Sequence, residues 1–123
     1  MLFSQFEDIE SWKKGRELAR EIYAVTNKSP FDKDWALKDQ VRRATISIIS
    51  NIAEGFERNS RNAFVNYLSI AKASAGELRS QLYIAMDQQY INESDFQRLV
   101  LMANDISRLI GGLMKKLRDK RNE

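Results

Sequence analysis

A row of polar side chains recurs through the segment 40–54 and offers varied hydrogen-bonding chemistry. Spacings of three and four residues place its members on one face of a helix: Gln40, Arg43, Ser47, Asn51 and Glu54. A guanidinium supplies a planar fork of donors, a carboxylate supplies acceptors, and the amides supply both. A second row with the same spacing contains Ser74, Glu77 and Gln81. The sequence predicts either two rows that meet between helices or two rows that face water.

If the rows meet, Arg43 and Glu77 are the natural partners for a bidentate hydrogen-bonded pair. Such a buried pair fixes the register between two helices more than it adds to stability. If the rows face water, the same side chains form two solvated stripes. Both interpretations stay open at this point.

Catalytic chemistry has few residues to draw on. The chain of 123 residues has no histidine and no cysteine, which removes the imidazole base, the thiol nucleophile and the usual zinc ligands. Two acidic clusters, Glu7–Asp8–Glu10 and Asp32 with Asp34, have the character of charges at helix N-termini. We therefore expect no enzyme, no metal and no cofactor.

The elements that carry these rows are helical. A single proline, Pro30, and apolar residues at 3.6-residue periodicity predict four helices at about 8–27, 30–54, 60–88 and 92–118. The N-caps are expected at Ser29, Ser60 and Asn92, and Gly55 is expected to form a left-handed C-cap. Four amphipathic helices with short connections favour an all-α fold, an antiparallel up-down four-helix bundle spanning residues 1–123 as one domain.

Helix two has more apolar surface than a single bundle can cover. Ile46 and Ile49 widen its apolar arc to roughly 180°, whereas a helix on the outside of a bundle needs a stripe somewhat over about 100° wide. On helix three, Ile70 and Ile84 lie opposite the core seam. The excess predicts self-association, and the alternative is that these are ordinary scattered apolar residues on a surface.

The positive charge is modest and uneven. The net charge is +3, from 20 basic and 17 acidic residues, and the excess falls in 35–61 and 92–123. Candidate nucleic-acid-binding residues are Arg42, Arg58, Arg61, Lys115, Lys116, Lys120 and Arg121. Solvated surface cations, with those of the tail complementing a helix C-terminus, are the alternative. Phe56 is the one aromatic residue near these cations that could stack on a base.

A family resemblance covers nearly the whole chain. The run Gln40–Gly55, which contains Arg-Arg-Ala followed by Asn-Ile-Ala-Glu-Gly, resembles the signature of bacterial four-helix bundle proteins encoded in intervening sequences of 23S ribosomal RNA genes. Supporting pieces are Trp12, Tyr23, Ser29–Phe31, Arg58, 64–71, Ser74 and Glu77–Leu78. The resemblance implies a ring-shaped homopentamer. It also implies kinship with a basic pentameric accessory protein of retroelements that binds nucleic acid and a reverse transcriptase, although this chain is far less basic.

These observations leave two functional hypotheses. The first is a non-catalytic oligomer that binds RNA, DNA or a reverse transcriptase-like protein through basic residues pooled in a ring. The second is a self-associating or protein-binding scaffold with no nucleic-acid role. No apolar run approaches the roughly 18 residues of a membrane span, so we expect a cytoplasmic protein with no membrane partner.

Overall fold

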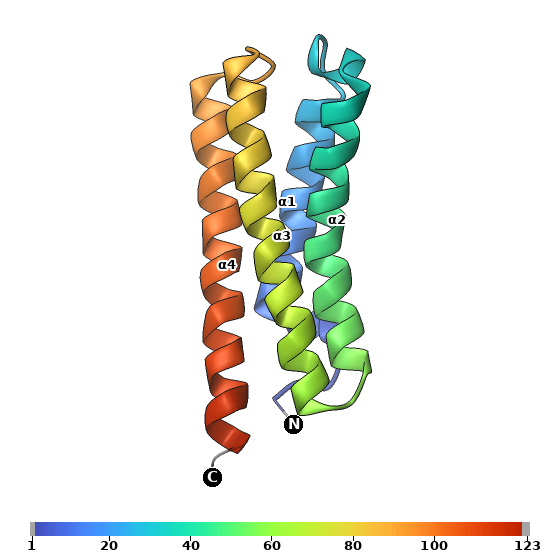
Figure 1. Ribbon diagram of the computed structural model, residues 1–123, viewed down its shortest axis with the longest axis vertical. Helices are drawn as coiled ribbons and strands as arrows, with labels where there is room; N and C mark the ends of the chain where they lie inside the picture. Colours follow the sequence, from blue (N-terminus) through green and yellow to red (C-terminus); the bar gives the residue numbers. More distant parts are fainter. Residues whose placement is uncertain (1, 122–123) are drawn as a thin grey trace.

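The computed structural model describes residues 2–121, with side chains as far as Asp119. Its four α-helices are α1 (Glu10–Thr26), α2 (Trp35–Glu57), α3 (Arg61–Asp87) and α4 (Glu93–Arg121). Short 3₁₀ helices precede α1 and α2, at Phe6–Asp8 and Phe31–Lys33. Successive helices run in opposite directions (Figure 1). The prediction of an all-α four-helix bundle is confirmed.

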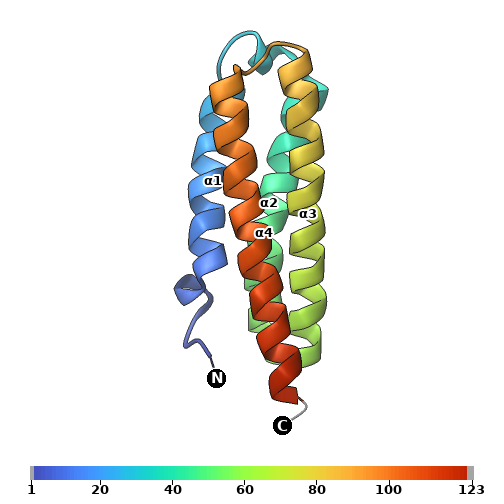
Figure 2. The same ribbon diagram turned by 90° about the vertical axis from the view of Figure 1, so that its left-hand side faces the viewer.

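The helices pack in the cyclic order α1–α2–α3–α4, so that α1 contacts α2 and α4, and α3 contacts the same two helices. Figure 2 shows this arrangement from the side of α4, with α1 to its left, α3 to its right and α2 behind. Each helix buries a stripe at spacings of three and four, and the stripes form one hydrophobic core. Fully buried members include Leu18, Ile22, Ile48, Ile52, Leu68, Leu78, Leu82, Leu99, Ile106 and Ile110.

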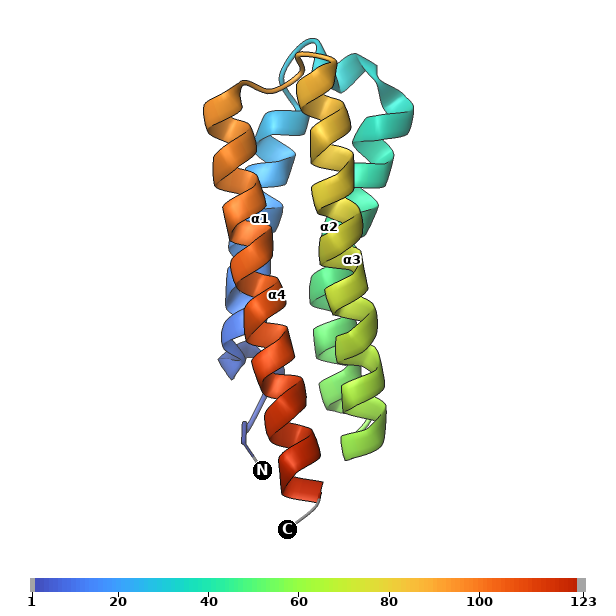
Figure 3. The same cartoon turned by 60° about the vertical axis from the view of Figure 1, so that its left-hand side comes forward.

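The bundle has two distinct ends. At one end lie both chain termini and the turn between α2 and α3, and we call it the terminal pole (Figure 3). At the other end lie the connections 27–34 and 88–92, and we call it the loop pole. The terminal pole carries Arg58, Arg61, Lys115 and Lys116, whereas the loop pole carries the contact between Tyr90 and Asp34.

The start of the second helix differs from the prediction. Ser29 and Pro30 do not begin α2. Instead Asp34 is its N-cap, and the Asp34 carboxylate accepts a hydrogen bond from the backbone N–H of Leu37 at 3.1 Å. Phe31 explains the shift, because its fully buried ring stacks on Tyr90 at 5.1 Å between centroids. Burial of this ring holds 31–33 in a separate 3₁₀ turn.

The end of the second helix also differs. The expected left-handed cap at Gly55 is wrong, because α2 continues to Glu57 and no described glycine has a positive φ. The left-handed residue is Asn59, with a φ of 54°. Gly55 instead permits a close helix contact: a Cβ placed there would lie 2.6 Å from the Cβ of Tyr67 on α3. A side chain at this position would push α2 and α3 apart.

The caps of the last two helices are confirmed. The hydroxyl of Ser60 accepts a hydrogen bond from the N–H of Ala63 at 3.3 Å, and the amide oxygen of Asn92 accepts one from the N–H of Asp95 at 2.7 Å. Both side chains satisfy N–H groups that the first helical turn leaves without a partner. α4 extends to Arg121, one turn beyond the predicted end.

Candidate nucleic-acid interface and assembly face

The two polar rows meet between α2 and α3 at one point, Ser47 and Ser74, and their charged members face outward. The hydroxyl oxygens of Ser47 and Ser74 lie 2.8 Å apart, and the Asn51 amide donates to the carbonyl and the hydroxyl of Ser47 at 2.8 and 3.0 Å. These three side chains are half-buried. They form a small hydrogen-bonded network that ties the two helices together near their middle.

The predicted Arg43–Glu77 pair is wrong. Arg43 donates from Nε to Asp39 at 2.8 Å, one turn away on the same helix, and both side chains are exposed. Glu77 accepts a hydrogen bond from the Gln81 amide at 3.2 Å. The two ionic groups lie on the outer side of their helices, where a partner four residues away is closer than one on the next helix.

An outer stripe on α3 combines polar and apolar residues at spacings of three and four. Its ends are isoleucines that are half exposed, Ile70 at 50% and Ile84 at 47%. Between them lie Ser74, Glu77 and Gln81. We call these five residues the α3 stripe. On α2, Ile46 is 42% exposed, so part of the expected apolar excess is present in the structure.

Ile49 does not belong to that excess. It faces α1, where a Cβ placed on the buried Gly15 would lie 2.4 Å from the Cγ2 of Ile49. Ile49 is half-buried and packs against α1, and its place at a subunit interface stays a prediction. The remaining members of the α2 row, Gln40 and Glu54, are exposed.

Three further exposed apolar residues were not singled out from the sequence. They are Trp35, Tyr83 and Leu101, each more than half exposed. Trp35 is the most exposed of the large hydrophobic residues, at 76%, and the Lys38 ammonium lies 5.2 Å from its ring centroid. Leu101 stands in the apolar run 99–102, and the signal of its exposure is that the residues three and four positions away on both sides are polar.

Arg42 serves the fold. Its Nε donates to the hydroxyl of Thr26 and its second guanidinium nitrogen to the Asn27 side chain, both at 2.9 Å. The guanidinium also lies over the ring of Tyr23, 4.2 Å from the centroid. Because these contacts hold Arg42 against the end of α1, it is the least suitable of the predicted residues for binding phosphate.

The other described candidate cations gather at the terminal pole. Arg58 and Arg61 flank the α2–α3 turn, while Lys115 and Lys116 lie near the end of α4, at the same end of the bundle (Figure 1). All four are exposed. Arg58 donates to the hydroxyl of Tyr67 at 2.7 Å. The side chains of Lys120 and Arg121 lie outside the described part of the chain.

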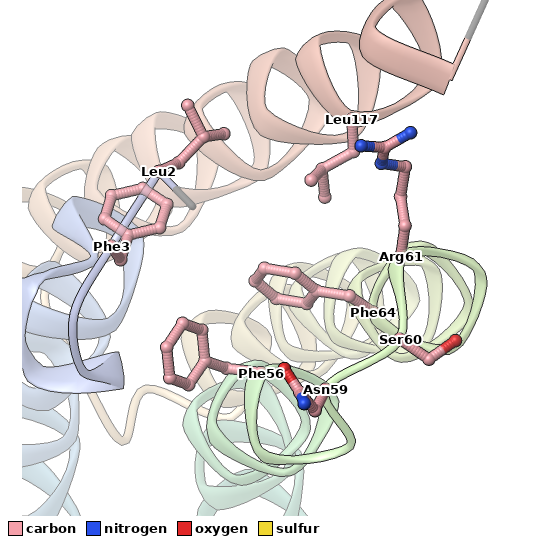
Figure 4. Close-up of a pocket in the computed structure, with 8 residues that line it drawn as sticks. All are labelled: Leu2, Phe3, Phe56, Asn59, Ser60, Arg61, Phe64 and Leu117. Atoms are coloured by element: carbon pink, nitrogen blue, oxygen red, sulfur yellow. The ribbon is translucent and has the colours of Figure 1, made fainter.

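A pocket of about 220 Å³ opens at the terminal pole. Its walls come from the N-terminal segment, the end of α2, the start of α3 and α4. The rings of Phe3, Phe56 and Phe64 converge on it, and Arg61 stands at its edge (Figure 4). Phe56 and Phe64 meet edge to face with 6.0 Å between centroids. Sequence reasoning found Phe56 but not the two rings beside it.

The loop pole holds a different polar contact. The hydroxyl of Tyr90 donates to the Asp34 carboxylate at 2.9 Å. This hydrogen bond, then burial and the negative charge of Asp34, raise the pKa of Tyr90 above its ordinary value of 10.0. The contact joins the start of α2 to the connection before α4 and is structural.

The described residues form neither a metal-binding cluster nor a membrane-spanning helix. Residues 2–121 contain no cluster of three or more acidic, histidine or cysteine side chains that could hold a metal. Within the same residues, no helix is long and apolar enough to span a membrane.

The architecture defines the class of protein as a four-helix bundle, with exposed isoleucines on its outer face. Residues 7–112 match the model of the family described as 23S rRNA-intervening sequence protein, so the chain belongs to that family. A similar solved structure is a protein of unknown function from the S23 ribosomal protein family of Bacteroides thetaiotaomicron VPI-5482. The two are 26% identical with a TM-score of 0.77, over 85% of this chain and 98% of the other. No curated protein matches the chain.

Proposed function

We propose that this protein is a non-catalytic, self-assembling bundle that binds nucleic acid through the cations of its terminal pole. One observation carries the proposal: Arg61 at the start of α3 and Lys115 and Lys116 near the end of α4 lie at one pole, and they form no ion pair with any described acidic side chain. Unpaired cations on one surface are the electrostatic footprint that phosphate binding requires.

Cations elsewhere on the bundle contrast with these. Arg98 pairs with Glu21 and Asp95, Arg108 pairs with Asp105, and Arg43 pairs with Asp39. A carboxylate beside an arginine lowers the net positive charge that this place on the surface offers to a phosphate. Arg20, Lys28 and Lys33 are also exposed and form no ion pair with a described acidic side chain, so the terminal pole differs in bringing cations of α3 and α4 together at one end of the bundle.

Assembly would multiply this modest charge. A ring of five chains, as the family resemblance implies, would carry about +15 from five copies of +3. The half-exposed isoleucines of the α3 stripe supply an apolar surface for contact between copies. Charge pooled on one particle makes binding strong at low salt and steeply dependent on salt concentration.

The binding experiment is a fluorescence anisotropy titration with a single-stranded oligonucleotide over a range of salt concentrations. The test variant replaces Arg61, Lys115 and Lys116 by Gln. The control replaces Arg20, Lys28 and Lys33 by Gln, which gives the same change in net charge at exposed positions in the half of the bundle nearer the loop pole.

We expect the test variant to lose at least about tenfold in affinity at low salt. If all three cations contact phosphates, its salt slope should fall by about 2, since each single-strand contact contributes about 0.7. The control should change far less. Equal losses in both variants would show that only net charge matters and would contradict a binding pole.

The assembly experiment is light scattering coupled to size exclusion. We expect the unmutated protein to be a multimer and Ile70→Asp to be smaller, because an unpaired carboxylate would be buried at the contact. Leu101→Asp is the matched control, since Leu101 is 58% exposed against 50% for Ile70 but lies on α4. A monomeric unmutated protein would remove the assembly half of the proposal.

A scaffold without a nucleic-acid role is the second candidate. The exposed Ile46, Ile70 and Ile84 favour it, because they support contact with protein whether or not nucleic acid binds. This function predicts a multimer by light scattering together with no change in anisotropy for any oligonucleotide.

A further inference from the structure

The pocket at the terminal pole lies beside the cations that carry the proposed function. It is lined mainly by apolar groups, among them the rings of Phe3, Phe56 and Phe64 and the side chain of Leu117. Figure 4 shows these groups converging from different elements on one hollow. A site with several aromatic walls favours a flat ligand that offers a π-face.

Two polar groups stand at the edge of this pocket. The Arg61 guanidinium is exposed and has no acidic partner among the described side chains. Asn59 presents an amide from the turn, where its φ of 54° fixes the backbone in the left-handed region. An anion would complement the guanidinium, and the amide can donate to and accept from the edge of a polar ring.

The size of the pocket limits the ligand. Its volume of about 220 Å³ lies below the roughly 300 Å³ at which pockets for drug-sized molecules begin. One ring system fits such a space, and a stack of rings does not. A flat polar ring joined to a phosphate meets every requirement of the site.

We propose that this pocket receives one unstacked base of a single-stranded nucleic acid, while Arg61 binds the adjoining phosphate. The proposal rests on the nucleic-acid function proposed above and gives it a substrate class. A duplex is disfavoured because its bases are already stacked and paired, so none is free to enter. Phe56 is the ring best suited to substitution. It is half-buried at the end of α2, whereas Phe64 is a buried core residue.

The test compares two fluorescent oligonucleotides of equal length. One carries thymine at each position, and the other is abasic at each position with the same sugar-phosphate backbone. Anisotropy gives the ratio of their affinities for the unmutated protein, for Phe56→Leu and for Phe6→Leu. Phe6 is the matched control, because it is half-buried against Trp12 and does not line the pocket. Circular dichroism confirms that each variant remains folded.

We expect the unmutated protein to prefer the oligonucleotide with bases by about tenfold, the usual scale of one stacking contact. Phe56→Leu should abolish most of this preference while binding of the abasic strand stays unchanged, and Phe6→Leu should keep the preference. Asn59→Gly, which retains the left-handed turn, should weaken the preference without changing the salt slope.

Other outcomes separate the two proposals. Equal, salt-dependent affinity for both strands would overturn the base pocket and leave the phosphate-binding function intact. Absence of binding to either strand would overturn both. Binding of free thymidine monophosphate without binding of either strand would also overturn both, because it would assign the pocket to a mononucleotide.

Discussion

At the scale of single residues, two glycines lie in opposite surroundings, one crowded by a neighbouring helix and one open. Gly55 is needed because α2 and α3 approach too closely there for a side chain. Gly112 lies within α4 with no atom within 4 Å of the place where a Cβ would stand. The sequence alone suggests a helix cap at Gly55. It cannot show that Gly55 lies against another helix while Gly112 does not, because that depends on how the helices pack.

Substitution by alanine should therefore have opposite effects at these two positions. We expect Gly55→Ala to destabilise the fold by about 1–3 kcal/mol, since Tyr67 has to move away from the new methyl group. Gly112→Ala should stabilise it by about 0.5–1 kcal/mol through helix propensity. Urea denaturation measures both. A stabilising Gly55→Ala would contradict the close contact.

Tyr90 gives a second prediction at this scale. Its pKa is raised in the folded state above 10.0, so its contribution to stability is fully present below that pH and is lost as pH rises through the folded pKa. Tyr90→Phe should therefore show less loss of stability between neutral and strongly alkaline pH. Asp34→Asn, which keeps an N-cap, should lower the pKa of Tyr90 in an ultraviolet titration of tyrosinate. An unchanged titration would contradict the role of Asp34.

At the scale of helices, the sequence predicts caps that depend on neighbouring residues. It does not predict helix ends that depend on contact with another part of the chain. Ser60 and Asn92 cap their helices by bonds to N–H groups three residues on, so their roles follow from short-range sequence. The predicted cap of α2 is Ser29, whereas the structure has Asp34. The burial of Phe31 against Tyr90 decided between them, and that contact joins residues distant in sequence.

Contacts between α2 and α3 give a prediction at this scale. Double-mutant cycles to alanine should show coupling of about 0.5–1.5 kcal/mol between Ser47 and Ser74, which lie within hydrogen-bond distance. The cycle between Arg43 and Glu77 should be additive within about 0.3 kcal/mol. Thermal or urea denaturation supplies the free energies, and strong coupling of Arg43 with Glu77 would contradict the structure.

At the scale of the whole molecule, the topology followed from four amphipathic segments with short connections. The gathering of cations follows from the same topology, because an even number of antiparallel helices returns the end of α4 to the level of the α2–α3 turn. The pocket between them could not be predicted, since its walls come from four separate parts of the chain. Arg42 likewise looked free in sequence and is held by α1.

Assembly should make thermal stability depend on protein concentration. If only folded chains associate, a tenfold rise in concentration should stabilise each chain by about 1 kcal/mol and raise Tm by a few degrees. Ile70→Asp should abolish this dependence, and Leu101→Asp should keep it. Differential scanning calorimetry at several concentrations measures the effect, and a constant Tm for the unmutated protein would contradict assembly.

The position of both chain ends also dictates how the protein should be attached to a surface or labelled. A purification tag at either end would sit over the arginines and lysines and compete with their ligand. Because the chain has no cysteine, Ser29→Cys would create one reactive thiol at the loop pole. Immobilised through that sulfur, the bundle would stand with its charged end directed away from the support.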